Sequence, residues 1–188
     1  MTRLYHSGFQ IIERPDLKIG RRNADFGQGF YLSGDAEFSR RWARQRKGMT
    51  TYLNEYELDP EGLNIKRFSL DGEWLDYILA NRNSRPDALA DHDVIIGPIA
   101  VDTIYETWGV ITGGVINKEQ ALELLKIGQT YEQTVIKTKK GLSSLRFVKA
   151  ETIGEEETAA YLETLRREER EFQETFAKRL EEMMETDG

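Results

Sequence analysis

The sequence of 188 residues contains no cysteine, which excludes disulfides, thiolate metal sites and cysteine nucleophiles. It has only two histidines, His6 and His92, far apart in the chain, so no zinc site is expected. No apolar run approaches the ~20 residues of a membrane span, and the first residues lack the apolar core of a signal peptide. We therefore expect a cytoplasmic protein with no membrane segment and no metal.

The acidic charge of the chain is concentrated at its C-terminal end. From Glu151 onward there are 13 acidic and 5 basic residues, whereas residues 1–150 carry 20 acidic and 21 basic residues. The body is thus close to neutral, and the overall net charge of −7 says little about whether the body binds nucleic acid.

The acidic segment is predicted to be one long helix over residues 155–185. Large apolar residues recur along it every three to four positions and form one stripe: Leu162, Leu165, Phe172, Phe176, Leu180 and Met183. This stripe must be covered by the body, by a second copy of the chain through self-association, or by a partner. We divide the chain into a domain at residues 1–153 and this helix at 154–188.

Residues 1–153 read as a mixture of strands and helices. Strands are expected at 3–6, 30–32, 50–58, 64–69, 93–99, 132–137 and 146–152, from alternation and apolar runs. Helices are expected at 35–47, from 71 onward, and at 103–110, 117–127 and 139–145, from caps and apolar spacing.

The most distinctive stretch is Asp25–Ser33, in which two glycines precede a run of strand-forming residues. Gly27 and Gly29 allow the backbone to approach a ligand or another strand closely. In the strand that follows, Phe30 and Tyr31 must face opposite sides, so that one fills the core while the other lines a cleft. The alternative is an ordinary buried strand after a flexible turn.

Two arginines, Arg21 and Arg22, stand just before this stretch. In that position they could meet a phosphate group, or they could simply be solvated.

An ordered set of short motifs runs through residues 3–150 and leaves the acidic helix outside. The motifs are Leu4-Tyr5-His6, Asp25 to Leu32, Trp42-Ala43, Asp93 to Ala100, Gln133, Lys137-Thr138-Lys139 and Leu145-Arg146-Phe147. Together they resemble a bacterial domain-of-unknown-function family assigned to the ADP-ribosyltransferase-like fold. Members of this family are often the toxin of a toxin–antitoxin pair.

The resemblance implies an α+β fold with a split β-sheet core, in which two short packed sheets form a cleft. It also implies the histidine–tyrosine–acid site of diphtheria-toxin-like and poly-ADP-ribose-polymerase-like transferases. His6 would then hydrogen-bond a ribose of NAD, Tyr31 would stack on the nicotinamide, and the backbone of Ser7 would hold the nicotinamide amide. A later strand would supply the residue that binds the hydroxyl of the nicotinamide ribose.

Two features depart from that pattern. The histidine is usually followed by Gly-Ser, but here by Ser7-Gly8. The later strand has Gln133 where glutamate is usual, and the neighbouring Glu132 should point to the opposite face if Gln133 points inward. Gln133 is the preferred third residue, and a strand shifted by one residue would put Glu132 there instead.

The expected function is that of an NAD-dependent mono-ADP-ribosyltransferase, a bacterial or phage toxin or effector that modifies a macromolecule. NAD would be a substrate, and a small antitoxin would be a further partner. Two alternatives remain open: an NAD glycohydrolase, in which water replaces the acceptor, and a non-catalytic module that binds NAD or ADP-ribose. The sequence does not identify the acceptor, since acceptor loops are the variable part of such folds.

Overall fold

The computed structural model describes residues 1–43, 48–100 and 116–186. Its strands are β1 (Thr2–Gly8), β2 (Phe30–Ser33), β3 (Thr51–Leu58), β4 (Ile65–Arg67), β5 (Val94–Pro98), β6 (Glu132–Ile136) and β7 (Leu145–Ile153). Its helices are the 3-10 helix η1 (Leu17–Ile19), α1 (Ala36–Arg41), α2 (Gly72–Arg82), α5 (Lys118–Leu125), α6 (Lys139–Ser143) and α7 (Glu155–Thr186). The α+β class is confirmed.

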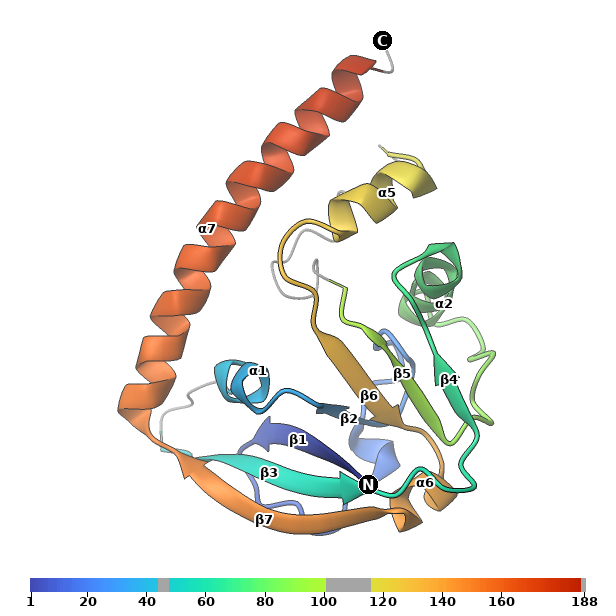
Figure 1. Cartoon of the computed structure of the whole chain (residues 1–188), viewed down its shortest axis with the longest axis vertical. Coiled ribbons are helices and arrows are strands. Elements are labelled where there is room, and N and C mark those ends of the chain that lie inside the picture. The colour runs from blue at the N-terminus through green and yellow to red at the C-terminus, as the bar shows by residue number, and fades with distance from the viewer. Residues whose placement is uncertain (44–47, 101–115, 187–188) are drawn as a thin grey trace.

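Within these residues all seven strands belong to one mixed sheet, in the order β4-β5-β6-β2-β1-β3-β7 (Figure 1). Among the described strands only β4 and β5 pair in parallel, and the other neighbours are antiparallel. The prediction of two separate packed sheets is therefore wrong. The two halves of the sheet nevertheless meet at a single paired position, Tyr5 opposite Ser33, so β1 and β2 share much less of their length than the other neighbours.

Side chains that alternate along the strands supply two clusters of apolar residues. On β5, Ile95 belongs to the cluster that contains Trp74 of α2, whereas Val94 and Ile96 belong to the cluster that contains Leu4 of β1. Because β5 is buried on both faces, its sequence is an uninterrupted apolar run.

Polar residues fix where the helices begin. Asp35 accepts a hydrogen bond from the backbone N–H of Phe38 at the start of α1, and Asp71 caps α2 in the same way. Asn117 and Gln120 form a reciprocal capping box at α5, which satisfies N–H groups that the helix itself cannot. Helix α1 spans Ala36–Arg41. The end of the helix predicted at 35–47 includes residues 44–47, which lie outside the described residues, as does the helix predicted at 103–110.

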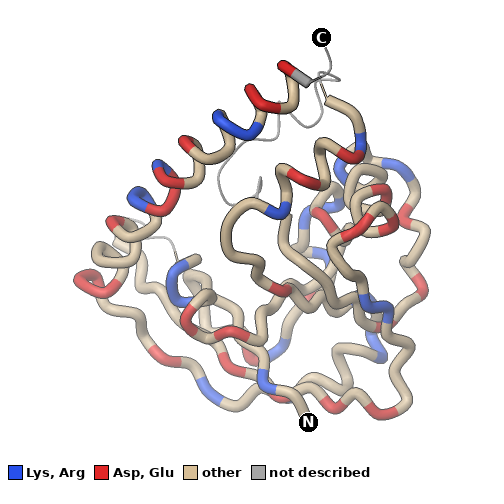
Figure 2. Tube along the Cα trace, turned by 45° about the horizontal axis from the view of Figure 1, so that its top comes forward, with Lys and Arg blue, Asp and Glu red and all other residues tan. Residues whose placement is uncertain are grey.

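Helix α7 runs along one side of the molecule, past α1 and α5 (Figure 1). Acidic and basic residues are interspersed along it (Figure 2). Phe172 and Phe176 are buried in the same apolar cluster as α2 and α5, and Leu180 and Met183 pack against that cluster. The body therefore covers this part of the apolar stripe, one of the three predicted options. In the part of the chain that the structure describes, no helix is long and apolar enough to cross a membrane.

Candidate functional site

A pocket of about 320 Å³ lies where β1, β2 and β6 approach α1. This volume is at the lower end of the ~300–1,000 Å³ usual for small-molecule sites. Among the described residues, its walls are formed by Tyr5, His6, Ser7, Arg21, Ala24, Asp25, Tyr31, Leu32, Ser33, Phe38, Ser39, Trp42, Ile99 and Gln133. The three residues proposed from sequence as the catalytic set thus come together from three different strands.

His6 lies on β1 beside β2, and its ring packs against Phe30 with centroids 4.9 Å apart. Its Nδ1 donates a hydrogen bond to the backbone oxygen of Tyr31 at 2.8 Å. A carbonyl oxygen can only accept, so Nδ1 carries the proton and Nε2 of the neutral ring is an acceptor. Burial lowers the pKa of His6 below its ordinary value of 6.5, although the bond to Tyr31 opposes this shift. The ring is therefore neutral at physiological pH.

Tyr31 is held by the glycine loop, the name used here for residues 25–29. Its hydroxyl donates to the backbone oxygen of Gly27 at 2.7 Å and accepts from the backbone N–H of Phe26 at 3.0 Å. Burial raises the pKa of Tyr31 far above its ordinary value, so the hydroxyl stays protonated. The phenol is fixed at its polar end, and its ring lines the pocket.

Gln133 lies on β6, between Ser33 of β2 and Gly97 of β5. Its side chain lines the pocket, the residue is 8% exposed, and its amide nitrogen Nε2 has no hydrogen-bond partner among the described residues. An unpaired buried donor costs roughly 1–3 kcal/mol, so a ligand group that accepted a hydrogen bond from this nitrogen would recover part of that cost. The neighbouring Glu132 faces away and pairs with Arg67 at 3.4 Å on the exposed side, as strand alternation requires.

The other predicted binding residues divide into two groups. Ser7 and Arg21 line the pocket. Arg22 is exposed and does not line it. Gly8 does not line it either, and an added Cβ at Gly8 would be 3.4 Å from His6 Nε2.

Three of the predicted binding residues do not line the pocket: Gly27, Gly29 and Phe30. Gly29 lies against β6, since a Cβ on Gly29 would be 2.6 Å from the backbone oxygen of Ile136. Phe30 faces the opposite side of β2 from Tyr31 and is buried in the cluster that contains Tyr56. The close approach predicted for the glycines is thus, at Gly29, an approach to a strand.

Sequence reasoning missed several residues of the wall. Asp25 is buried there and pairs with Arg82 of α2 at 2.6 Å. Phe38 and Trp42 come from α1, and their spacing of four residues indicated a buried helix face but not a pocket. For Asp25, the sequence signal that pointed to the site was its position at the start of the glycine loop. Its partner is 57 residues away, beyond any local pattern.

A fully buried amide also supports β1. Asn54 on β3 donates to the backbone oxygens of His6 and Gln10 and accepts from the N–H of Ile12. It therefore ties the segment after β1 to the strand that carries His6.

Among the described residues, no group of three or more histidine, aspartate or glutamate side chains is arranged to hold a metal ion. Comparison with curated proteins finds no match. Residues 2–147 match DUF3990, a family described as "Protein of unknown function". Since the match covers most of the chain and ends before α7, the protein belongs to the DUF3990 family.

Proposed function

We propose that the pocket binds NAD and that the protein transfers ADP-ribose from NAD to a macromolecule. The observation that carries this proposal is the unpartnered, buried amide nitrogen of Gln133 in a pocket that also contains His6 and Tyr31. The toxin or effector role, the antitoxin partner and the ADP-ribosyltransferase-like identity of the fold are inferred from the resemblance of the motifs.

Each of the three side chains suits one part of NAD. The fixed ring of Tyr31 offers an aromatic face to the flat nicotinamide. His6 Nε2 accepts a hydrogen bond from a ribose hydroxyl, because the proton of the ring is on Nδ1. The amide of Gln133 donates to the hydroxyl of the nicotinamide ribose. Arg21 at the pocket wall is the residue placed to meet a phosphate.

The reaction breaks the bond between nicotinamide and ribose, and positive charge builds on the sugar as the bond lengthens. Groups that are already oriented toward that sugar stabilise the transition state without further reorganisation. The acceptor then attacks the sugar carbon and loses a proton. If water is the acceptor, the products are nicotinamide and ADP-ribose, and the protein is an NAD glycohydrolase.

A second candidate is a non-catalytic module that binds NAD or ADP-ribose. The identity of Gln133 favours it, since a neutral amide orients a hydroxyl but supplies no negative charge to a developing cation. Incubation with NAD labelled in the ADP-ribose part separates the three functions. Transfer puts label into protein, RNA or DNA, hydrolysis releases nicotinamide without incorporation, and the module binds NAD without turnover.

Substitutions on β6 test the site itself. Gln133→Ala should reduce nicotinamide release by ~10- to 1,000-fold, as expected for the loss of one oriented donor. Glu132→Ala is the matched control and should change little, because that carboxylate lies on the exposed side beside Arg67. If Glu132→Ala abolishes release and Gln133→Ala does not, the assignment of Gln133 is wrong.

Gln133→Glu and Tyr31→Ala complete the set. A carboxylate at position 133 would face the developing sugar cation, so release should be maintained or should rise. Tyr31→Ala removes the stacking surface and should mainly weaken NAD binding. If none of these variants alters a measurable turnover, the pocket is not the active site.

A further inference from the structure

A buried polar network contacts the glycine loop that holds Tyr31. Its centre is Lys137, directly after β6, with a side chain only 2% exposed. The ammonium group donates to the backbone oxygen of Phe26 and pairs with the carboxylate of Asp87. Asp87 also accepts hydrogen bonds from the hydroxyl of Tyr77 at 2.7 Å and the N–H of Leu89 at 3.0 Å. Both charges are thus paired and supplied with hydrogen bonds.

The backbone of Phe26 connects this network to Tyr31. Its oxygen accepts from Lys137, while its N–H donates to the Tyr31 hydroxyl at 3.0 Å. The next residue, Gly27, has φ +71° and supplies the oxygen to which that hydroxyl donates. A Cβ on Gly27 would overlap the Asp87 carboxylate and lie 2.9 Å from Lys137 Nζ. The glycine is therefore required by both its φ angle and the closeness of the ion pair.

We propose that Lys137, neutralised by Asp87, is a positioning residue that fixes the glycine loop and thereby the orientation of the Tyr31 ring. This inference rests on the proposed function, in which Tyr31 receives the nicotinamide. A hydroxyl with one fixed donor and one fixed acceptor cannot rotate freely, so the ring is in place before the ligand arrives. Lys137 acts through the loop and does not itself line the pocket.

The test variant is Lys137→Met/Asp87→Asn. It removes both charges together, so that no uncompensated buried charge remains, and the amide oxygen of the new asparagine can still accept from Tyr77. The matched control is Lys118→Met/Asp76→Asn, because Lys118 and Asp76 form an exposed pair at 2.6 Å away from the pocket walls. By calorimetry, NAD binding should weaken about tenfold in the test variant, since the ring must now be ordered on binding, and should be unchanged in the control.

A double-mutant cycle distinguishes positioning from general damage. Tyr31→Phe removes the hydroxyl through which the loop acts. In that background, Lys137→Met/Asp87→Asn should produce no further loss of NAD affinity. If the fold-losses of NAD affinity from Tyr31→Phe and from Lys137→Met/Asp87→Asn multiply in the combined variant, the ion pair acts independently of Tyr31. That result would overturn the proposal.

Hydrogen exchange of the Phe26 amide, measured by NMR without NAD, tests the same role independently of the ligand. This amide donates to Tyr31 and should exchange at least about tenfold faster in the test variant. In that variant the exchange rates of the α5 amides should not change. In the control variant the exchange rate of the Phe26 amide should not change. An unchanged Phe26 exchange rate contradicts the positioning role. Absence of NAD binding in the wild-type protein contradicts the proposed function alone, and the exchange rates then decide the role of Lys137.

Discussion

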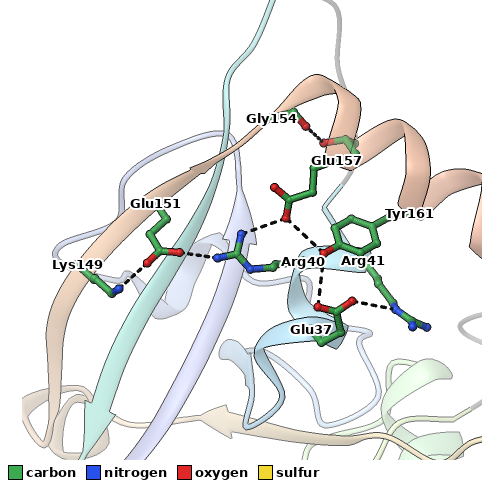
Figure 3. A network of polar contacts seen from close by, with 9 residues as sticks. Glu37, Arg40, Arg41, Lys149, Glu151, Gly154, Glu157 and Tyr161 are labelled. Carbon is green, nitrogen blue, oxygen red and sulfur yellow. Dashed lines mark hydrogen bonds and ion pairs between the residues drawn. The ribbon is translucent and has the colours of Figure 1, made fainter.

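Two clusters of charged residues hold segments beside the pocket, one at the glycine loop and one between α1 and α7. The first contains Lys137 and Asp87, whose side chains are 2% and 20% exposed. In the second, Arg40 of α1 pairs with Glu151 of β7 and with Glu157 of α7 (Figure 3). These three side chains are 23%, 39% and 37% exposed.

The difference in burial gives the two clusters different roles. Inside the protein, water cannot take the place of a lost partner. The remaining buried charge therefore stays unpaired, at a high cost in stability. Charges at the surface are rehydrated and screened when a partner is lost. The buried pair can therefore fix the geometry of the glycine loop, whereas the α1–α7 cluster adds only a small amount to packing that apolar residues provide.

The largest effect is expected for Lys137→Met alone. This change leaves the Asp87 carboxylate without its cation. Because that side chain is 20% exposed, the free energy of unfolding should fall by ~3 kcal/mol, the lower end of the range for a broken buried pair. Burial by itself would raise the pKa of Asp87, but hydrogen bonds from Lys137 and Tyr77 hold it below its ordinary value. Without Lys137 that pKa should rise, so the variant should lose less stability at acidic pH.

Chemical denaturation of the variant at neutral and acidic pH measures both quantities. The double variant Lys137→Met/Asp87→Asn is the control and should recover much of the loss. A loss below ~1 kcal/mol for the single variant would place the buried pair in the same class as surface pairs.

The second effect concerns how α7 is attached. Phe172 is 5% exposed in the core cluster that includes α5. Phe172→Ala should cost about 3 kcal/mol, at the lower end of the range for a buried phenylalanine. Met184, 58% exposed on the same helix, provides the control, and Met184→Ala should leave the denaturation midpoint unchanged. A smaller cost for Phe172→Ala than for loss of Arg40 would mean that charges, and not apolar contacts, attach α7.

The third effect is the pH dependence of NAD binding through His6. Burial lowers the pKa of His6, so below pH 6.5 the unfolded chain takes up the proton before the folded protein does. Stability from His6 is therefore present above its ordinary pKa and is lost as pH falls through the lowered one. Protonation also removes the Nε2 acceptor, so NAD affinity should fall about tenfold, or ~1.4 kcal/mol.

Calorimetric titration with NAD from about pH 7 to about pH 5 measures this change. As the pH falls, the affinity for NAD should still be unchanged just below pH 6.5 and should decrease at lower pH. His6→Gln should bind more weakly but without that decrease. If the variant keeps the same pH dependence, the titration of a group other than His6 causes the decrease in affinity.

The sequence was informative where the signal is local. Caps at Asp71 and Asn117 marked two helix starts, and strand alternation put Gln133 inward and Glu132 outward. It was not informative where partners are distant. Lys137 ends the strand predicted at 132–137, and a lysine is rarely buried unless it is paired. Its partners, Asp87 and the backbone oxygen of Phe26, are 50 and 111 residues away. The joining of the sheet through Tyr5 and Ser33 is likewise nonlocal.

The smallest effect is expected for Arg40→Met at the α1–α7 cluster. Methionine keeps most of the apolar stem, so the change mainly removes the ion pairs to Glu151 and Glu157. The loss should be ~0.2–1 kcal/mol, the usual range for exposed pairs. It should shrink further at about 1 M salt, where the screening length is ~3 Å.

Arg179→Met is the comparison variant, because the ion pair of Arg179 with Glu182 at 3.0 Å lies within one turn of α7. Denaturation at low and high salt compares the two variants. Helix α1 supplies Phe38 and Trp42 to the pocket, so NAD affinity reports whether the cluster also controls that wall. Affinity should stay within about twofold of wild type, since Phe38 remains stacked on Tyr131 with centroids 4.1 Å apart and apolar packing holds the helix. A tenfold loss that disappears with salt would instead make the exposed cluster, and not the buried pair, the element that sets the geometry of the site.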